Sequence, residues 1–281
     1  MLTKLLGAAA LVAVMAVPAA AGGYRTVDWA DLKAEIYGER EVAPALGQVV
    51  LEAPTRSADD RRVPIEVAAR LRDGTAISRV TLIIDENPMP VSAEFEFPEP
   101  RAAVRLGVDM RMNGPSPVRA VVETVDGRLL MTERLVKTSG LGACASPPVG
   151  DPAAAIAGIG QMRAEMLEVA SAGATSSSGG AATGPMVELS MKHPQHTGLQ
   201  MDQITLLFIQ ARYVHELEVR DAGEGAEGAE PLFRLTGSIS LSEDPALRFE
   251  LGDAAAERIE VKYTDTGGSE IVRSVPLGSE S

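Results

Sequence analysis

Short runs of alternating apolar and polar residues, separated by turn residues, recur along most of this 281-residue chain. A period of two is typical of half-buried β-strands, because successive side chains point to opposite faces of a sheet. Seven such runs precede residue 138 and seven more follow residue 185, which favours an all-β fold of two antiparallel sandwiches of the immunoglobulin type. The expected strands are 48–51, 63–67, 79–84, 93–97, 105–112, 118–125, 129–137, 186–191, 203–209, 215–219, 232–241, 247–251, 259–263 and 270–275.

The two sets of strands follow a similar plan. In each set, acidic residues and a proline precede a strongly alternating strand, at 85–88 and again at 243–245. Each set also closes with a hairpin, turned at Asp126-Gly127 in the first and at residues 265–268 in the second. The similarity predicts two related domains.

The residues between the two sets, 145–185, are rich in Ala, Pro, Ser and Gly. This composition is typical of a flexible linker, and its Ala-rich part predicts a helix over 153–169. We therefore expect one sandwich over residues 24–144 and a second over residues 186–281.

A short helix is predicted ahead of the first strand. Asp28 is a suitable N-cap, Trp29, Leu32 and Ile36 recur at helical spacing, and Gly38 supplies a stop.

The N-terminal 21 residues have the pattern of a cleavable secretory signal peptide. Lys4 precedes an apolar run from Leu5 to Val17, and Ala19-Ala20-Ala21 forms a small-residue cleavage site before Gly22. The run is short for a transmembrane helix. We therefore expect a protein exported to the periplasm.

The net charge of the chain argues against some classes of binding partner. With 26 basic and 39 acidic residues the formal net charge is −13, so the surface repels nucleic acid and anionic membranes. A single cysteine, Cys144, excludes an internal disulfide and a Cys-rich metal cluster.

Cys144 follows the last strand of the first set, in a segment of small residues. Gly140 and Gly142 give this segment backbone freedom, so we expect them to make a flexible arm that exposes the thiol. Six extended residues counted from Thr138 would carry the thiol roughly 20 Å from the sandwich edge. The alternative is a buried structural cysteine at a domain junction.

His193 and His196, with Met191 and Met201 nearby, raise the alternative of a copper site. Pro194 interrupts regular geometry between the two histidines, which favours an ordinary structural role. His215 is expected on the surface of a strand. No spacing pairs an acid with a base or forms a nucleophile triad, so we expect neither a cofactor nor catalysis by this chain alone.

Several segments, in order, resemble the SoxY and SoxZ families, the two subunits of the SoxYZ sulfur carrier. On the SoxY side they are IYGER (36–40), LEAP (51–54), VPI (63–65), ENPMP (86–90), MRM (110–112), DG (126–127) and VKTSG (136–140), and on the SoxZ side HP (193–194), TG (197–198), IQARYV (209–214) and residues 239–249. The chain is most similar to fused SoxYZ-like carriers associated with quinoprotein dehydrogenases.

The resemblance implies a non-enzymatic carrier of two immunoglobulin-like sandwiches. Its substrate would be held covalently on Cys144, as a sulfur oxyanion in the family, while periplasmic redox enzymes act on it. Those partners would be a quinoprotein dehydrogenase, a cytochrome c or Sox-type enzymes, and the two halves would pack as an internal SoxY/SoxZ-like pair.

The chain departs from the SoxY pattern at the cysteine. The family places it at the chain terminus within Gly-Gly-Cys-Gly-Gly, whereas residues 140–146 read GLGACAS and the chain continues. We therefore expect an arm tethered at both ends. An accessory protein that docks a quinoprotein dehydrogenase, with an incidental thiol, remains the alternative function.

Overall fold

The computed structural model describes residues 27–140, 142, 144–145, 152–167, 184–222, 230–251 and 257–278. The signal peptide expected over residues 1–21 lies outside these ranges and stays a prediction. Within them, no helix combines the length and the apolar character needed to cross a membrane.

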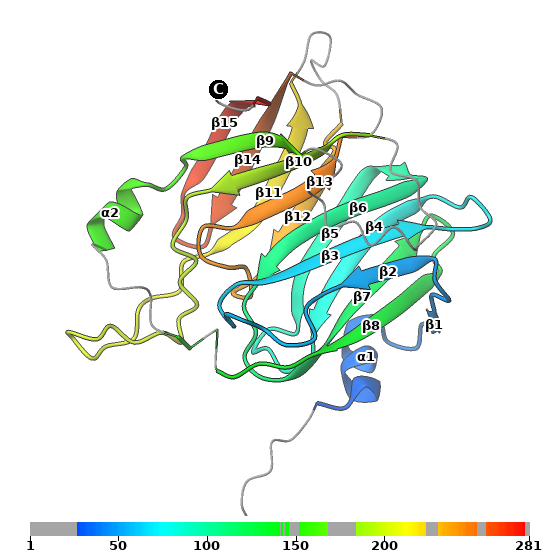
Figure 1. Ribbon diagram of the computed structural model, residues 1–281, viewed down its shortest axis with the longest axis horizontal. Coiled ribbons are helices and arrows are strands. Elements are labelled where there is room, and N and C mark those ends of the chain that lie inside the picture. The colour runs from blue at the N-terminus through cyan, green and yellow to red at the C-terminus, as the bar shows by residue number, and fades with distance from the viewer. Residues whose placement is uncertain are drawn as a thin grey trace, which may run out of the picture.

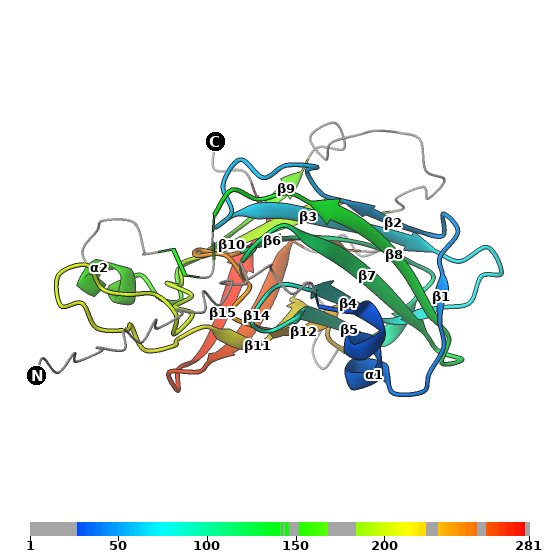
Figure 2. The ribbon, with the colours of Figure 1, turned by 90° about the horizontal axis from the view of Figure 1, so that it is seen from below.

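The strands form two sheets stacked face to face (Figures 1 and 2). The larger sheet has the order β1-β8-β7-β4-β5-β12-β11-β14-β15, and the smaller has the order β2-β3-β6-β13-β10-β9. The elements are α1 (Trp29–Tyr37), β1 (Val42–Pro44), β2 (Val49–Glu52), β3 (Val63–Arg70), β4 (Ile77–Ile84), β5 (Val91–Arg101), β6 (Ala103–Met110), β7 (Ser116–Thr124), β8 (Leu129–Val136), α2 (Pro152–Ala157), β9 (Met162–Leu167), β10 (Met186–Met191), β11 (Val214–Asp221), β12 (Phe233–Gly237), β13 (Ala246–Glu250), β14 (Arg258–Asp265) and β15 (Glu270–Pro276).

Alternating burial explains why these residues form strands. In β3, for example, Val63, Ile65 and Val67 are buried while the residues between them are exposed or half-buried. The inward-facing side chains of both sheets form one apolar cluster that runs through both halves of the chain. The predicted all-β fold with immunoglobulin-like sandwiches is confirmed.

Both sheets cross from the first half of the chain to the second. In the larger sheet β5 pairs antiparallel with β12, with Phe95 opposite Leu235, and in the smaller β6 pairs antiparallel with β13, with Val108 opposite Leu247. These pairings satisfy the backbone N–H and C=O groups that β5, β6, β12 and β13 would otherwise leave open. The two halves therefore meet strand to strand rather than through the connecting segment alone.

The predicted N-terminal helix is confirmed as α1. The carboxylate of Asp28 accepts the backbone N–H of Ala30 at 2.9 Å, and Gly38 ends the helix with a φ of 61°. Leu32 packs against Ile83 in β4 and neighbouring apolar residues, which attaches α1 to the larger sheet.

Three sequence predictions differ from the structure: the linker, the end of its helix and one strand. The expected linker 145–185 contains α2, which ends at Ala157 rather than Val169, and β9, which pairs antiparallel with β10. Residues 162–167 form a strand because β10 offers them an open sheet edge, with Ala164 buried against it. The strand predicted over 203–209 is wrong: these residues form an exposed loop, because no strand lies beside them to accept a ladder of hydrogen bonds.

Candidate functional site

The segment that carries Cys144 leaves β8 and follows the loop that contains Asp60. The backbone N–H of Lys137 donates to the Thr55 carbonyl at 3.0 Å, and the N–H of Ser139 donates to the Asp60 carboxylate at 2.9 Å. The N–H of Gly142 then donates to the Met112 carbonyl at 2.8 Å. The chain approaches Cys144 attached to the first half.

Gly142 allows a close approach between backbones. It is buried, and a Cβ atom at this position would lie 2.7 Å from the Met112 carbonyl oxygen and would overlap the Asp60 carbonyl group. A Cβ at Gly140 would meet only the end of the Asp60 side chain, at 3.1 Å. The structure thus gives Gly142 a packing role in place of the flexibility predicted for it, because only a residue without a side chain fits there.

Cys144 itself is a free, exposed thiol. The carbonyl of the next residue, Ala145, accepts a hydrogen bond from Nε2 of Gln200 at 3.0 Å, and Gln200 is buried in the second half. Cys144 therefore lies between two anchored residues: Gly142 contacts the first half of the chain, and Ala145 contacts the second. The thiol lies at the surface where the halves meet, rather than at the end of an extended 20 Å arm.

A buried arginine, Arg111, connects the two halves at this junction. The guanidinium of Arg111, only 2% exposed, donates to the carbonyls of Gln195 and Leu241 in the second half, both at 2.7 Å. Burial lowers the pKa of Arg111 to about 10. Because Arg111 precedes Met112, it positions the carbonyl that anchors Gly142.

Asn87 completes the polar network at the junction. Its side-chain amide donates to the Arg111 carbonyl at 2.8 Å and to the Ser240 hydroxyl at 2.9 Å, and its Oδ1 accepts from the backbone N–H of Asn113. Reasoning from residue types missed Arg111, Asn87 and Ser240, because buried polar groups have no periodic signal. The ENPMP and MRM segments of the family resemblance contain two of them.

The side chain of His193 is buried and hydrogen-bonded within the protein. His193 is 1% exposed; its Nε2 lies 3.3 Å from the Asp265 carboxylate, and its Nδ1 accepts from the backbone N–H of Gln195 at 3.1 Å. Both ring nitrogens of His193 are therefore used within the protein, which argues against the copper alternative. No group of three His, Cys, Asp or Glu in the described ranges could hold a metal ion. His215 is exposed on β11, as predicted.

We expect these histidines to make the protein less stable in weak acid. Burial lowers the pKa of both His193 and His196 below the ordinary value of 6.5, so the unfolded chain binds more protons than the folded chain just below pH 6.5. Their contribution to stability is present above that pH and falls as the pH drops through the window, by at most about 1.4 kcal/mol per pH unit for each histidine.

Urea unfolding between pH 7.5 and 5 measures this dependence. A His193→Gln variant should show a shallower decline, whereas His215→Gln, which changes an exposed histidine, should keep the decline of the unmodified protein. Equal slopes for all three proteins would contradict the assignment.

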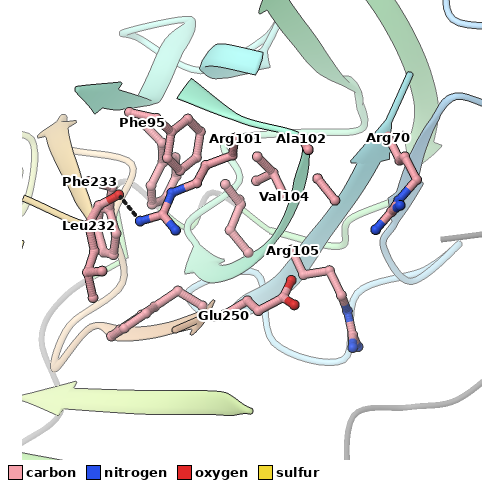
Figure 3. Close-up of a pocket in the computed structure, with 13 residues that line it drawn as sticks. Arg70, Phe95, Arg101, Ala102, Val104, Arg105, Leu232, Phe233 and Glu250 are labelled. Atoms are coloured by element: carbon pink, nitrogen blue, oxygen red, sulfur yellow. Dashed lines mark hydrogen bonds between the residues drawn. The ribbon is translucent and has the colours of Figure 1, made fainter. Parts of the chain in front are cut away.

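A cavity of about 290 Å³ lies where β5, β6, β12 and β13 meet (Figure 3). Phe95, Phe233 and Phe249 line it, and Arg101 reaches across to donate to the Leu232 carbonyl at 3.4 Å. The cavity contacts the start of β6, whereas the Met112 anchor follows the end of that strand, roughly 20–30 Å away. The cavity is therefore remote from the anchor of the segment that carries Cys144.

Comparison with known families matches two parts of the chain to two different family models. The model of the sulfur oxidation protein SoxY matches residues 33–144, and that of the sulphur oxidation protein SoxZ matches residues 177–276. The solved sulfur carrier protein SoxY from Chlorobium limicola f thiosulfatophilum is 22% identical, with 40% of this chain and 96% of that chain covered and a TM-score of 0.34. No curated protein matches. The chain therefore joins a SoxY domain, matched over residues 33–144, and a SoxZ domain, matched over residues 177–276, in one fused SoxYZ-like protein.

Proposed function

We propose that this protein is a periplasmic covalent carrier that holds a sulfur-containing intermediate on the thiol of Cys144 while partner redox enzymes act on it. The observation that carries the proposal is the position of Cys144: a free, exposed thiol at the last residue of the SoxY match, presented at the junction with the second half. The protein need not be a catalyst, because a carrier supplies only the attachment point.

Thiol chemistry suits reversible attachment. When the Cys144 thiolate attacks one sulfur of a sulfur–sulfur bond, a new bond forms to Cys144 and the other sulfur leaves with the electron pair, so no external oxidant is needed. Joining Cys144 to a cargo that is itself a thiol releases two protons to the solvent and two electrons. Two cytochrome c haems, which take one electron each, or a quinoprotein dehydrogenase, which takes both, would accept those electrons. We propose these redox enzymes, or Sox-type enzymes, as the partners.

Intact-mass measurement of protein purified from its host, before and after reduction, tests the proposal. We expect a mass adduct on Cys144 that reductant removes and that is missing from a Cys144→Ser variant. The same spectrum tests export, because cleavage after Ala21 leaves Gly22 as the first residue.

An unmodified thiol, together with a host pathway that survives Cys144→Ser, would overturn the carrier function. If that variant still recovered a quinoprotein dehydrogenase in a pull-down, the accessory function with an incidental thiol would replace it.

A further inference from the structure

The loop over residues 199–208, here called the apolar loop, exposes an unusual amount of apolar surface. Ile204 is 93% exposed, and the side chains of Leu206, Leu207 and Phe208 are each exposed by more than two thirds. Figure 1 shows this loop, in yellow-green, projecting beyond the ends of the strands. Contiguous exposed apolar residues of this kind mark interaction surfaces, because their contact with water is unfavourable until a partner covers them.

The apolar loop is held open by its own hydrogen bonds. The backbone N–H of Asp202 donates to the Leu207 carbonyl and the N–H of Ile209 donates to the Gln200 carbonyl, both at 2.9 Å. At the tip, the Asp202 carboxylate accepts the backbone N–H groups of Ile204 at 3.0 Å and Thr205 at 2.7 Å. These bonds fix a backbone that directs the apolar side chains into solvent instead of letting them collapse onto the sheets.

The base of the apolar loop contacts the segment that carries the thiol. Gln200, near the start of the apolar loop, donates through Nε2 to the carbonyl of Ala145, the residue next to Cys144. Ile204 is four residues beyond Gln200, at most about 14 Å along the chain. A protein interface of usual size covers roughly 800 Å² on each partner, a disc about 30 Å across, so one interface can cover both the loop tip and the thiol.

We propose that the apolar loop is the docking surface for the proteins that act on Cys144, and that it fits a partner with an apolar rim beside the entrance to its active site. This inference rests on the carrier function proposed above. The occupant is a protein rather than a bilayer, because the chain carries a formal net charge of −13, which opposes binding to anionic membranes. Docking through the loop places the thiol at the partner's entrance without a long arm.

The test begins with the protein released by reductant from a mixed disulfide on Cys144 in periplasmic extract. Once purified, it is titrated against the full-length carrier and against an Ile204→Ser/Leu207→Ser variant. We expect the loop variant to bind at least tenfold more weakly, with an unchanged thermal midpoint because both side chains are exposed. Val272→Ser, an exposed apolar residue on β15, is the matched control and should bind like the unmodified protein.

The outcomes distinguish a failure of the proposed carrier function from a failure of the proposed docking surface. If Cys144 carries neither a protein nor a small adduct that reductant removes, the carrier function fails and the docking surface fails with it. If a protein does engage Cys144 but binds the loop variant as tightly as the unmodified chain, only the docking surface is overturned. If the unmodified protein binds phosphatidylcholine vesicles and the loop variant does not, the apolar loop is a membrane anchor and the docking proposal is equally overturned.

Discussion

An Arg119→Met variant is expected to lose about 3–5 kcal/mol of its free energy of unfolding, because the substitution leaves a buried carboxylate unpaired. Arg119 is 6% exposed, and its Nε and Nη2 atoms donate to the carboxylate of Asp85, itself 1% exposed, at 2.9 and 2.8 Å. The guanidinium also lies 4.2 Å from the ring of Trp29, so its loss weakens the attachment of α1 to the larger sheet.

Urea unfolding of two further variants gives this prediction its controls. Arg128→Met breaks ion pairs with Asp73 and Asp126, but the Arg128 side chain is 43% exposed and the loss should stay below about 1 kcal/mol. An Asp85→Leu/Arg119→Met double variant should regain much of the stability, since no buried charge is left unpaired and Glu133, the other partner of Arg119, is exposed. A single Arg119→Met variant as stable as Arg128→Met would show that the buried pair contributes no more than a surface pair.

A Gly142→Ala variant is expected to detach the Cys144 segment from the first half. The added Cβ would lie 2.7 Å from the Met112 carbonyl oxygen and overlap the Asp60 backbone, and neither backbone can move without disturbing a strand or its adjoining loop. Overpacking of this kind costs about 1–3 kcal/mol, so exchange of the residue 142 amide hydrogen should become roughly 5- to 150-fold faster.

Hydrogen exchange followed by mass spectrometry or NMR measures the effect of Gly142→Ala at that amide. Gly278→Ala is the matched control, because a Cβ at Gly278 meets nothing within 4 Å. Unchanged protection of the residue 142 amide in Gly142→Ala would contradict the packing role. It would mean that Gly142 provides conformational freedom to the backbone, as its sequence context suggests.

Much of the fold could be predicted from periodicity and turn residues. The alternating pattern of β3 reflects one face packed in the core, and the turns at Gly127 and Gly268 require positive φ angles, which are 83° and 89°. Both signals are local, so they are readable without a tertiary structure.

The incorrect sequence predictions also have physical reasons. The segment 203–209 has the apolar residues of a strand, but a strand needs a neighbour, and pairing partners are decided over long sequence distances. For the same reason the sequence predicts residues 162–167 as part of a linker: Ala-rich composition suggests flexibility, whereas in the structure these residues pair with the open edge of β10 in the smaller sheet.

The sequence by itself determined the strand-rich fold, the unique thiol at Cys144 and the families to which the two halves belong, because these follow from local patterns and ordered motifs. Only the tertiary structure decided where that thiol lies. The pairing of β5 with β12 and of β6 with β13 joins the halves, and the contacts of Gly142 with Met112 and of Ala145 with Gln200 hold Cys144 at their junction beside the apolar loop. Hydrogen bonds between residues so far apart in the chain exist only once the two sheets have formed.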